Sequence, residues 1–209
     1  MALQLQQQQR QAKKCHAGDV NVTDRQAFRD RLGAERVASV ARVAMEQPRV
    51  KGQRWVISSQ DEMRRAVIDV AREASRRVSI YTHDLEPGIY DDPDFLEVIK
   101  HLVLSKTYAR IRVLIADPTR AIKNGNAFVQ LGRRLNTYIE FRHVREDLRT
   151  HPESFCIADN NALVYRLQAS RWEGIADTFE PTISAHYSAM FDEIWQASEV
   201  EIEFRQLGI

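Results

Sequence analysis

The residues most suited to chemistry lie in one short segment, where His151 and Glu153 precede a run of β-forming residues. In an extended chain alternate side chains share a face, so His151 and Glu153 are expected to point the same way. An imidazole can act as a nucleophile or as a general acid or base. The pair is therefore a candidate site, although a His–Glu contact is structural as often as functional, and His151 could also simply lie in a loop.

A β-hairpin is predicted over residues 151–166, because β-forming residues stand on both sides of Asn160-Asn161. Tandem asparagine tolerates the positive φ that a two-residue turn needs. Such a turn would place residue 155 opposite Arg166, close to the His151 end of the hairpin. Arg166 is then expected either to pair with Glu153 or to bind phosphate through its guanidinium group.

Further polar residues follow two other predicted strands. His83 and Asp84 end the strand at 77–82, and Asp117 ends the apolar strand at 109–117. Ligand crevices of open α/β sheets lie at the carboxyl ends of strands, so these side chains are candidates to share one crevice with His151. The alternatives are a plain loop histidine at His83 and a turn-capping role for Asp117.

The elements that must position these residues alternate along the chain. Strands are predicted at 54–58, 77–82, 109–117 and 136–143, and helices after Ser59 and at 95–104, 128–135 and 181–197. This order predicts an α/β fold, with a mixed, mostly parallel sheet flanked by helices. Residues 171–179 are expected to form a loop that packs over the sheet.

The N-terminal part has a different composition. Residues 1–20 are rich in glutamine and are expected to form a disordered or frayed tail. Residues 21–50 carry a capping-box pattern at Thr23 and an apolar helical stripe, and Pro48 ends that segment. They predict a helical arm that covers a sheet edge or serves oligomerisation, followed by the α/β domain at 54–209.

Composition restricts the function classes. The 209 residues carry a net charge of +1, so no global charge favours nucleic acid or an anionic membrane. No apolar run is long enough to span a membrane, and the two cysteines, Cys15 and Cys156, fit a reducing cytoplasm better than a disulfide framework. No histidine or cysteine pair has metal-ligand spacing, so no metal and no cofactor are predicted.

From about residue 60 to residue 200, the order of elements resembles one unit of the phospholipase D superfamily, whose motif is His-x-Lys-x-x-x-x-Asp. That resemblance implies a histidine nucleophile, a second histidine that protonates the leaving oxygen, and lysines that stabilise the phosphoryl oxygens. In this chain His151 matches the first motif position. Because the chain has one motif, the resemblance implies a homodimer that brings two such histidines together, with His83 as another candidate second base.

The chain departs from that motif at three places. Glu153 occupies the lysine position, Ala158 occupies the aspartate position with Asp159 one residue late, and Arg166-Leu167 stands where active members have glycine and serine or threonine. A carboxylate at about 4 Å from a phosphodiester would cost around 4 kcal/mol at an effective dielectric constant of about 20. These departures favour a non-catalytic module that binds a partner, a phosphorylated ligand or nucleic acid. The alternative is a divergent phosphodiesterase or nuclease with His151 as nucleophile and Arg166 in the lysine role.

Overall fold

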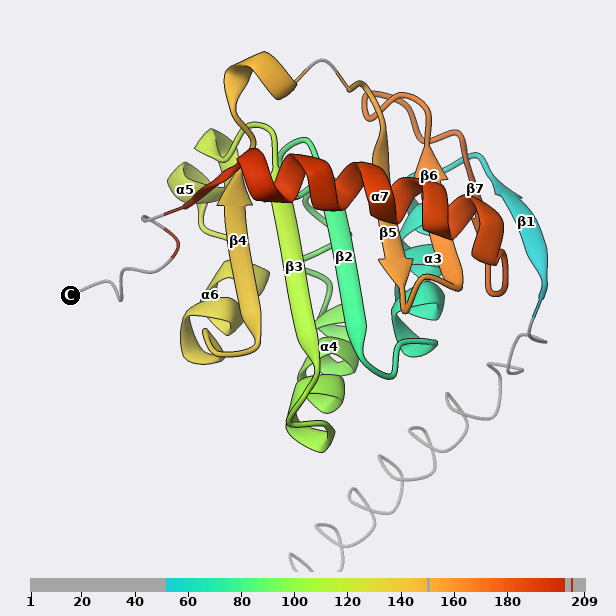
Figure 1. Ribbon diagram of the computed structural model, residues 1–209, viewed down its shortest axis with the longest axis horizontal. Coiled ribbons are helices and arrows are strands. Elements are labelled where there is room, and N and C mark those ends of the chain that lie inside the picture. The colour runs from blue at the N-terminus through green and yellow to red at the C-terminus, as the bar shows by residue number, and fades with distance from the viewer. Residues whose placement is uncertain (1–51, 150, 202–203, 205–209) are drawn as a thin grey trace, which may run out of the picture. The chain divides into compact units, whose positions relative to one another are not determined.

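The computed structural model describes residues 52–149, 151–201 and 204. The predicted N-terminal tail and helical arm lie outside these residues. Strands and helices alternate through most of the described chain (Figure 1), with these bounds: β1 Arg54–Ile57, α3 Gln60–Arg72, β2 Arg77–Thr82, α4 Pro93–Ser105, β3 Arg110–Ile115, α5 Thr119–Asn124, α6 Ala127–Arg134, β4 Ile139–His143, η1 Glu146–Leu148, β5 Ser154–Ala158, β6 Ala162–Arg166, β7 Gly174–Asp177, α7 Pro181–Ala197 and β8 Glu199–Val200.

Within the described residues, eight strands form one mixed sheet in the order β1-β7-β6-β5-β2-β3-β4-β8. The neighbours β2–β3 and β3–β4 are parallel. The other neighbouring pairs are antiparallel. The predicted mixed α/β fold is confirmed, but the sheet is less parallel than predicted. The parallel strands are confined to the centre, where helical crossovers connect them.

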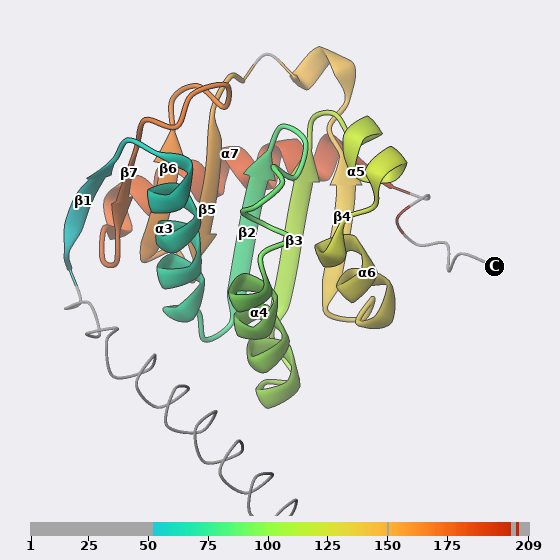
Figure 2. The same ribbon diagram turned by 180° about the vertical axis from the view of Figure 1, so that it is seen from behind.

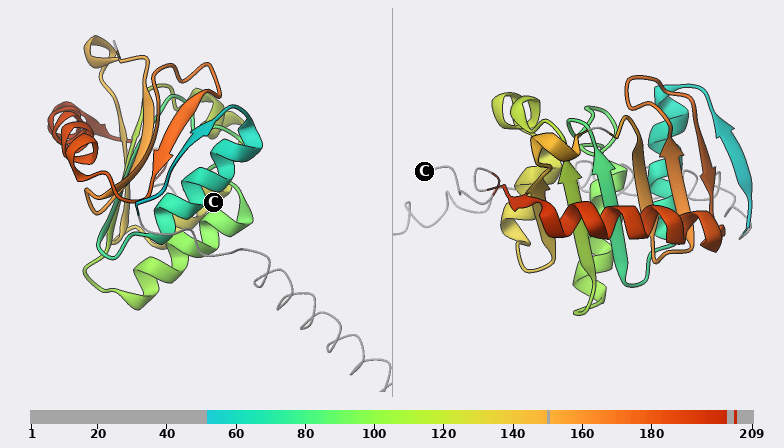
Figure 3. Two further views of the ribbon diagram at one scale, coloured as in Figure 1. Left: turned by 90° about the vertical axis from the view of Figure 1, so that its right-hand side faces the viewer. Right: turned by 45° about the horizontal axis from the view of Figure 1, so that its top comes forward.

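Helices lie on both faces of the sheet. Figure 2 shows α3, α4 and α6 on one face, where their apolar side chains join the strands in a large core cluster. Figure 3 shows α7 crossing the other face. Beneath α7 lies a smaller cluster that includes Tyr81, Phe155 and Phe191. Residues of β2 and β5 therefore alternate between the two clusters, as expected for strands that are covered on both sides.

Local sequence explains where the main helices begin. The side chain of Ser59 accepts a hydrogen bond from the backbone N–H of Glu62, which confirms the predicted start of α3. Asp92 caps α4 in the same way, and Pro93 occupies its first turn, where a missing N–H costs nothing. Each helix then presents an apolar face to the sheet, which fixes its position against the core.

The expectation of a loop over 171–179 is wrong in part, because Gly174–Asp177 forms strand β7 between β1 and β6. The strand is short and begins with glycine, so its pattern in the sequence is weak. A Cβ atom on Gly174 would lie 2.7 Å from the carbonyl oxygen of Tyr165, so the close approach of β6 requires glycine there. Trp172, just before β7, does pack against the large core cluster.

Cys156 in β5 is fully buried, and burial raises the pKa of its thiol to about 12. A thiol in this state is a packing residue and a poor nucleophile, as predicted. No helix of the described chain is both long and apolar enough to cross a membrane.

Candidate functional site

The candidate site lies along the upper edge of the sheet in Figure 1, where the parallel strands β2, β3 and β4 end and β5 begins. His83 and Asp84 directly follow β2, and Asp117 lies two residues after β3. The backbone N–H of Asp117 donates to the carbonyl oxygen of His83 at 2.7 Å, so these residues are neighbours. The structure therefore places all three at the crevice edge that the sequence predicts.

His151 and Glu153 stand just before β5 and contact each other. Nδ1 of His151 lies 3.6 Å from Oε2 of Glu153, and the two side chains are 37% and 25% exposed. Phe155 packs beneath α7, and alternation along the strand puts Glu153 on that same face. The predicted contact is thus present, and it holds an acidic group beside the histidine.

Two buried oxygen atoms in this region have no hydrogen-bond partner among the described residues, namely the hydroxyl of Tyr81 and Oε2 of Glu153. Burial raises the pKa of Tyr81 to about 12, and the charge of Glu153 acts in the same direction. A buried polar group without a partner costs free energy, so these two atoms destabilise the fold locally.

Arg149 is the cation that the sequence analysis missed. It follows the short 3₁₀ helix η1, and its Nη2 atom lies 2.5 Å from Nε2 of His143 at the end of β4. Its Nε donates to the carbonyl oxygen of Val144 at 3.1 Å, which fixes the side chain against the strand end. In the sequence Arg149 stands two residues before His151, and this short spacing is the signal that could have pointed to Arg149.

The charges of this edge interact. Hydrogen bonds from Thr119 lower the pKa of Asp117, and the charges of His83 and Arg149 act in the same direction. Asp117 therefore caps the turn before α5, as one of its predicted roles, and also lies within electrostatic reach of Arg149. Histidine and arginine side chains from three different connections thus gather at one end of the sheet.

Arg166 is on the other face of the sheet. Its side chain is 3% exposed and forms an ion pair with Glu86, which follows β2. The guanidinium also lies over the ring of Trp172, 5.0 Å from its centroid. Its hydrogen-bond acceptors are Glu86, the hydroxyl of Ser154, and the carbonyl oxygens of Ala169 and Arg171. These contacts give Arg166 a structural role, in which it fixes the β6–β7 connection to the β2–α4 loop.

The register of the hairpin explains why Arg166 does not meet Glu153. Ser154, and not Phe155, lies opposite Arg166. The central turn residues are Asp159 and Asn160, with φ of 51° and 61°, and not Asn160-Asn161. The one-residue difference sends Arg166 to the face of α3, while Glu153 points to the face of α7. The predicted Glu153–Arg166 pair is therefore wrong.

Asp159 is engaged at the opposite end of β5. Its carboxylate accepts hydrogen bonds from the backbone N–H groups of Ser75, Arg76 and Arg77 and from the hydroxyl of Ser75, at 2.5–3.2 Å. Burial acts to raise the pKa of Asp159, but these hydrogen bonds outweigh it and lower the pKa. The aspartate therefore joins the hairpin turn to the start of β2 and has no contact with His151.

A cavity of about 370 Å³, lined mostly by polar residues, opens at the same upper edge, on the side of Glu86. His83 and Asp84 line it together with Arg120 and Trp172. Asp84 accepts a hydrogen bond from Arg120 at 2.8 Å, so its charge is already compensated. His83 lines this cavity and its carbonyl oxygen also contacts Asp117, so it lies between the cavity and the charged cluster around Asp117. Over the described ranges, no group of three histidine, cysteine, aspartate or glutamate residues is placed to hold a metal ion.

The fold is similar to that of TrmBL2, whose structure is described as that of an archaeal chromatin protein with a novel mode of DNA binding. The TM-score is 0.52 at 12% sequence identity, and the match covers 84% of this chain and 65% of TrmBL2. The chain thus spans slightly less than two thirds of that protein.

Two further solved structures are also similar, at TM-scores of 0.45. One is Nuc, a phospholipase D family member from Salmonella typhimurium, with 14% identity and coverage of 71% of this chain and 99% of Nuc. The other is the phosphatidylserine synthase of Haemophilus influenzae Rd KW20, with 11% identity and coverage of 75% and 40%.

A comparison with curated proteins found no match. A family model does match, over residues 59–207, which include every element from α3 to β8 and thus the whole candidate site. The chain belongs to the family described as "Domain of unknown function (DUF7931)".

Proposed function

We propose that this domain is a non-catalytic, phospholipase D-like binding module, which works as a homodimer in the cytoplasm and takes a phosphorylated ligand at its upper edge. The observation that carries the proposal is the contact of Glu153 with His151. A phosphodiesterase of that type needs a cation where Glu153 stands, because negative charge accumulates on the phosphoryl oxygens during the reaction. A carboxylate there opposes the reaction.

The neighbouring groups support the same conclusion. Arg166, the cation nearest in the hairpin, is already paired with buried Glu86 on the other face of the sheet. Asp159, the nearest substitute for the motif aspartate, is bound to the backbone at 75–77. Both side chains are engaged elsewhere, which supports a role other than phosphodiester hydrolysis.

Ligand binding has better support than catalysis. Arg149 and His83 supply guanidinium and imidazole groups at the edge where α/β sheets bind ligands, and His143, which faces Glu201 through its other ring nitrogen, contacts Arg149. Guanidinium groups bind phosphate oxygens through charge-assisted hydrogen bonds. The DNA binding described for TrmBL2 is compatible with a nucleotide or nucleic acid as the natural ligand.

A divergent phosphodiesterase that uses His151 as its nucleophile is the second candidate. The position of His151 favours it, since the imidazole is partly exposed at the ligand-binding edge and Arg149 precedes it closely in the chain. In such an enzyme Arg149, and not Arg166, would have to take the role of the missing lysine.

Replacement of Arg149 by glutamine should weaken the binding of inorganic phosphate and 5′-AMP by roughly ten- to hundredfold, because a charge-assisted hydrogen bond is lost. Arg145→Gln is the matched control, since Arg145 stands four positions before Arg149, is exposed and pairs with Asp147. Calorimetric titration of the full chain measures both variants. Equal binding by the wild type and Arg149→Gln would contradict the site.

Catalysis is tested in the same preparations with a generic phosphodiester such as bis(p-nitrophenyl) phosphate. We expect no turnover from the wild type. Hydrolysis by the wild type that disappears in His151→Ala would exclude the non-catalytic binding module and support the divergent phosphodiesterase. Light scattering after size-exclusion chromatography tests the homodimer, and a monomeric mass at micromolar concentration would exclude that part of the proposal.

A further inference from the structure

The second surface of interest is the lower half of the sheet face that α7 crosses. Figure 1 shows that α7 lies over the upper part of β2, β3 and β4 and that no element of the described chain covers their lower part. Alternation along the strands puts Arg77, Arg110 and Arg112 on this face, because Tyr81 and Leu114 of the same strands pack beneath α7.

Two of these arginines, Arg77 and Arg110, stand close together, whereas Arg112 pairs with Asp192 of α7. Arg77 and Arg110 are direct partners across the parallel pair β2–β3. Among the described residues no carboxylate forms an ion pair with either, and their donors meet the amide oxygen of Asn160 and the carbonyl oxygens of Thr107 and Ala109. Like charges directly opposite on a sheet are destabilising. A bound anion would remove that cost.

Tyrosine rings stand beside these arginines. The guanidinium of Arg76 lies over the ring of Tyr108, 5.7 Å from its centroid, and that of Arg110 lies over Tyr138 at 5.8 Å. Tyr108 lies in the turn before β3 and is 55% exposed. Tyr138 packs against the large core cluster, so the exposed ring of Tyr108 supplies the stacking surface beside the positive charge.

We propose that this surface binds single-stranded nucleic acid. We name it the arginine strip, and it consists of Arg77, Arg110 and Arg112 on the strands, with Arg76 and Tyr108 just before β2 and β3. Arginines neutralise phosphates, while aromatic rings and guanidinium planes stack on unpaired bases. A duplex presents no free base faces, and the flat strip has no protruding element that could enter a groove.

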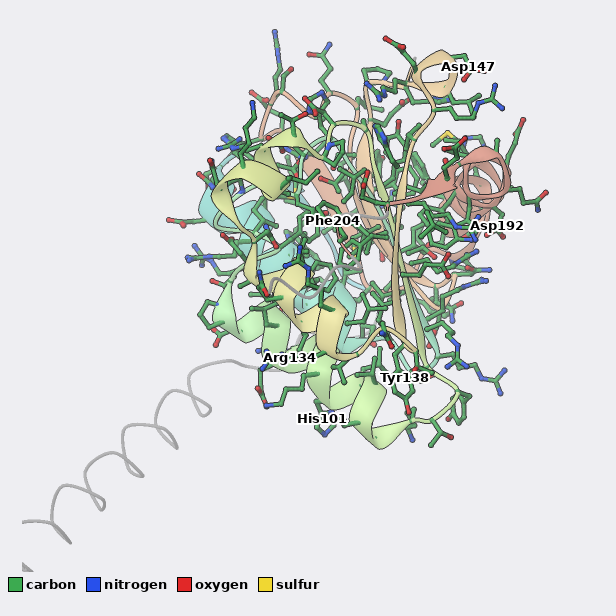
Figure 4. The ribbon with its side chains drawn as sticks, turned by 90° about the vertical axis from the view of Figure 1, so that its left-hand side faces the viewer. His101, Arg134, Tyr138, Asp147, Asp192 and Phe204 are labelled. Carbon is green, nitrogen blue, oxygen red and sulfur yellow. The ribbon has the colours of Figure 1, made fainter. Side chains whose placement is uncertain are left out.

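The strip is distinct from the upper edge. Figure 4 shows the sheet from its side, with Asp147 of η1 near one end and Tyr138 near the other. Asp192 of α7 forms an ion pair with Arg112 at 2.7 Å and so marks the upper border of the strip. A ligand on the strip therefore needs none of the residues around His151, and each surface can be tested without the other.

The experiment measures fluorescence anisotropy of labelled oligo(dT), oligo(U) and a duplex of matched length with the full chain. We expect both single strands to bind more tightly than the duplex. The double variant Arg77→Gln/Arg110→Gln should bind them at least about tenfold more weakly, and the slope of log K against log salt concentration should fall by about 0.7 for each lost phosphate contact. Tyr108→Leu should weaken binding several-fold and leave that slope unchanged.

The matched control is Arg65→Gln/Lys100→Gln, which removes the same charge from exposed positions of α3 and α4 on the other face. It should bind like the wild type. Thermal unfolding separates a folding defect from a binding defect, since removal of the Arg77–Arg110 repulsion should leave the melting temperature unchanged or higher. The proposal is overturned by equal binding of wild type and double variant, by an equal loss in the control, by preference for the duplex, or by no binding. If Arg149→Gln still binds oligonucleotides, the arginine strip proposal stands even where the upper edge binds no phosphate.

Discussion

Replacement of Arg166 by methionine should lower the free energy of unfolding by about 3–5 kcal/mol, the usual cost of removing one partner from a buried ion pair. The side chain of Arg166 is 3% exposed and that of Glu86 is 9% exposed, so water cannot replace the lost partner. The substitution would leave the carboxylate of Glu86 buried with the hydroxyl of Thr82 as its remaining hydrogen-bond partner among the described residues.

The same substitution should loosen the chain between β6 and β7. Arg166 donates to the carbonyl oxygens of Ala169 and Arg171 at 3.0 and 3.2 Å, and its guanidinium lies over Trp172. Without it, those carbonyls lose their internal partner and the ring loses its cover. We therefore expect a shift in tryptophan fluorescence and faster proteolysis within 167–173, in addition to the loss of stability.

Urea unfolding followed by circular dichroism measures the effect, which corresponds to a fall in melting temperature of roughly 6–20 °C for a domain of this size. Arg120→Met is the matched control, because Arg120 pairs with Asp84 at the same edge but is 53% exposed, and it should cost less than about 1 kcal/mol. The double variant Glu86→Leu/Arg166→Met should be more stable than Arg166→Met, since no charge is left buried. A cost below about 1 kcal/mol for Arg166→Met would contradict the structural role of the pair.

Much of the fold follows from local pattern. The strand predicted at 109–117 is nearly continuous in apolar residues, and it is β3, a central strand with a helix-bearing layer on one side and α7 above it. The predicted helix at 181–197 has the bounds of α7. Such elements bury a whole face, so the spacing of their apolar residues fixes both their type and their position.

Other features depend on contacts between distant residues. The partner of Arg166 is Glu86, which stands 80 positions away in a loop, and no spacing in the hairpin points to it. Strand β7 exists because β1 and β6 offer open edges, although Gly174 and Asp177 are weak strand formers. The hairpin register depends on whether Asp159 or Asn161 is the other central residue of the turn beside Asn160. The hydrogen bonds from the backbone at 75–77 to the Asp159 carboxylate favour Asp159.

The candidate site shows the same limit. The sequence places His83, Asp117 and His151 at strand ends, and the topology brings those ends to one edge. It could not show that Arg149 reaches His143, because that contact depends on how η1 folds back on β4. A difference of one residue in the hairpin register was enough to put the expected cation, Arg166, on the other face of the sheet.

Replacement of Asp159 by alanine should lower the free energy of unfolding by about 2–3 kcal/mol. Hydrogen bonds to a charged acceptor contribute about 1.5–3 kcal/mol when buried, and partial exposure of this carboxylate reduces that figure. Alanine at φ of 51° adds about 1 kcal/mol of backbone strain, which asparagine largely avoids. Asp159→Asn should therefore cost about half as much as Asp159→Ala, and the two variants separate the turn from the charge.

The pH dependence identifies the charge as the cause. The pKa of Asp159 is lowered in the folded protein, so on acidification the unfolded chain takes up the proton first. The stabilisation is fully present above the unfolded pKa near 4 and is lost as pH falls through the lower folded pKa. The stability difference between wild type and Asp159→Asn should thus be constant from about pH 5 to 8 and shrink below about pH 4. A difference that persists unchanged in acid would mean that the carboxylate acts through shape and not through its charge, and that the start of β2 is held by other contacts.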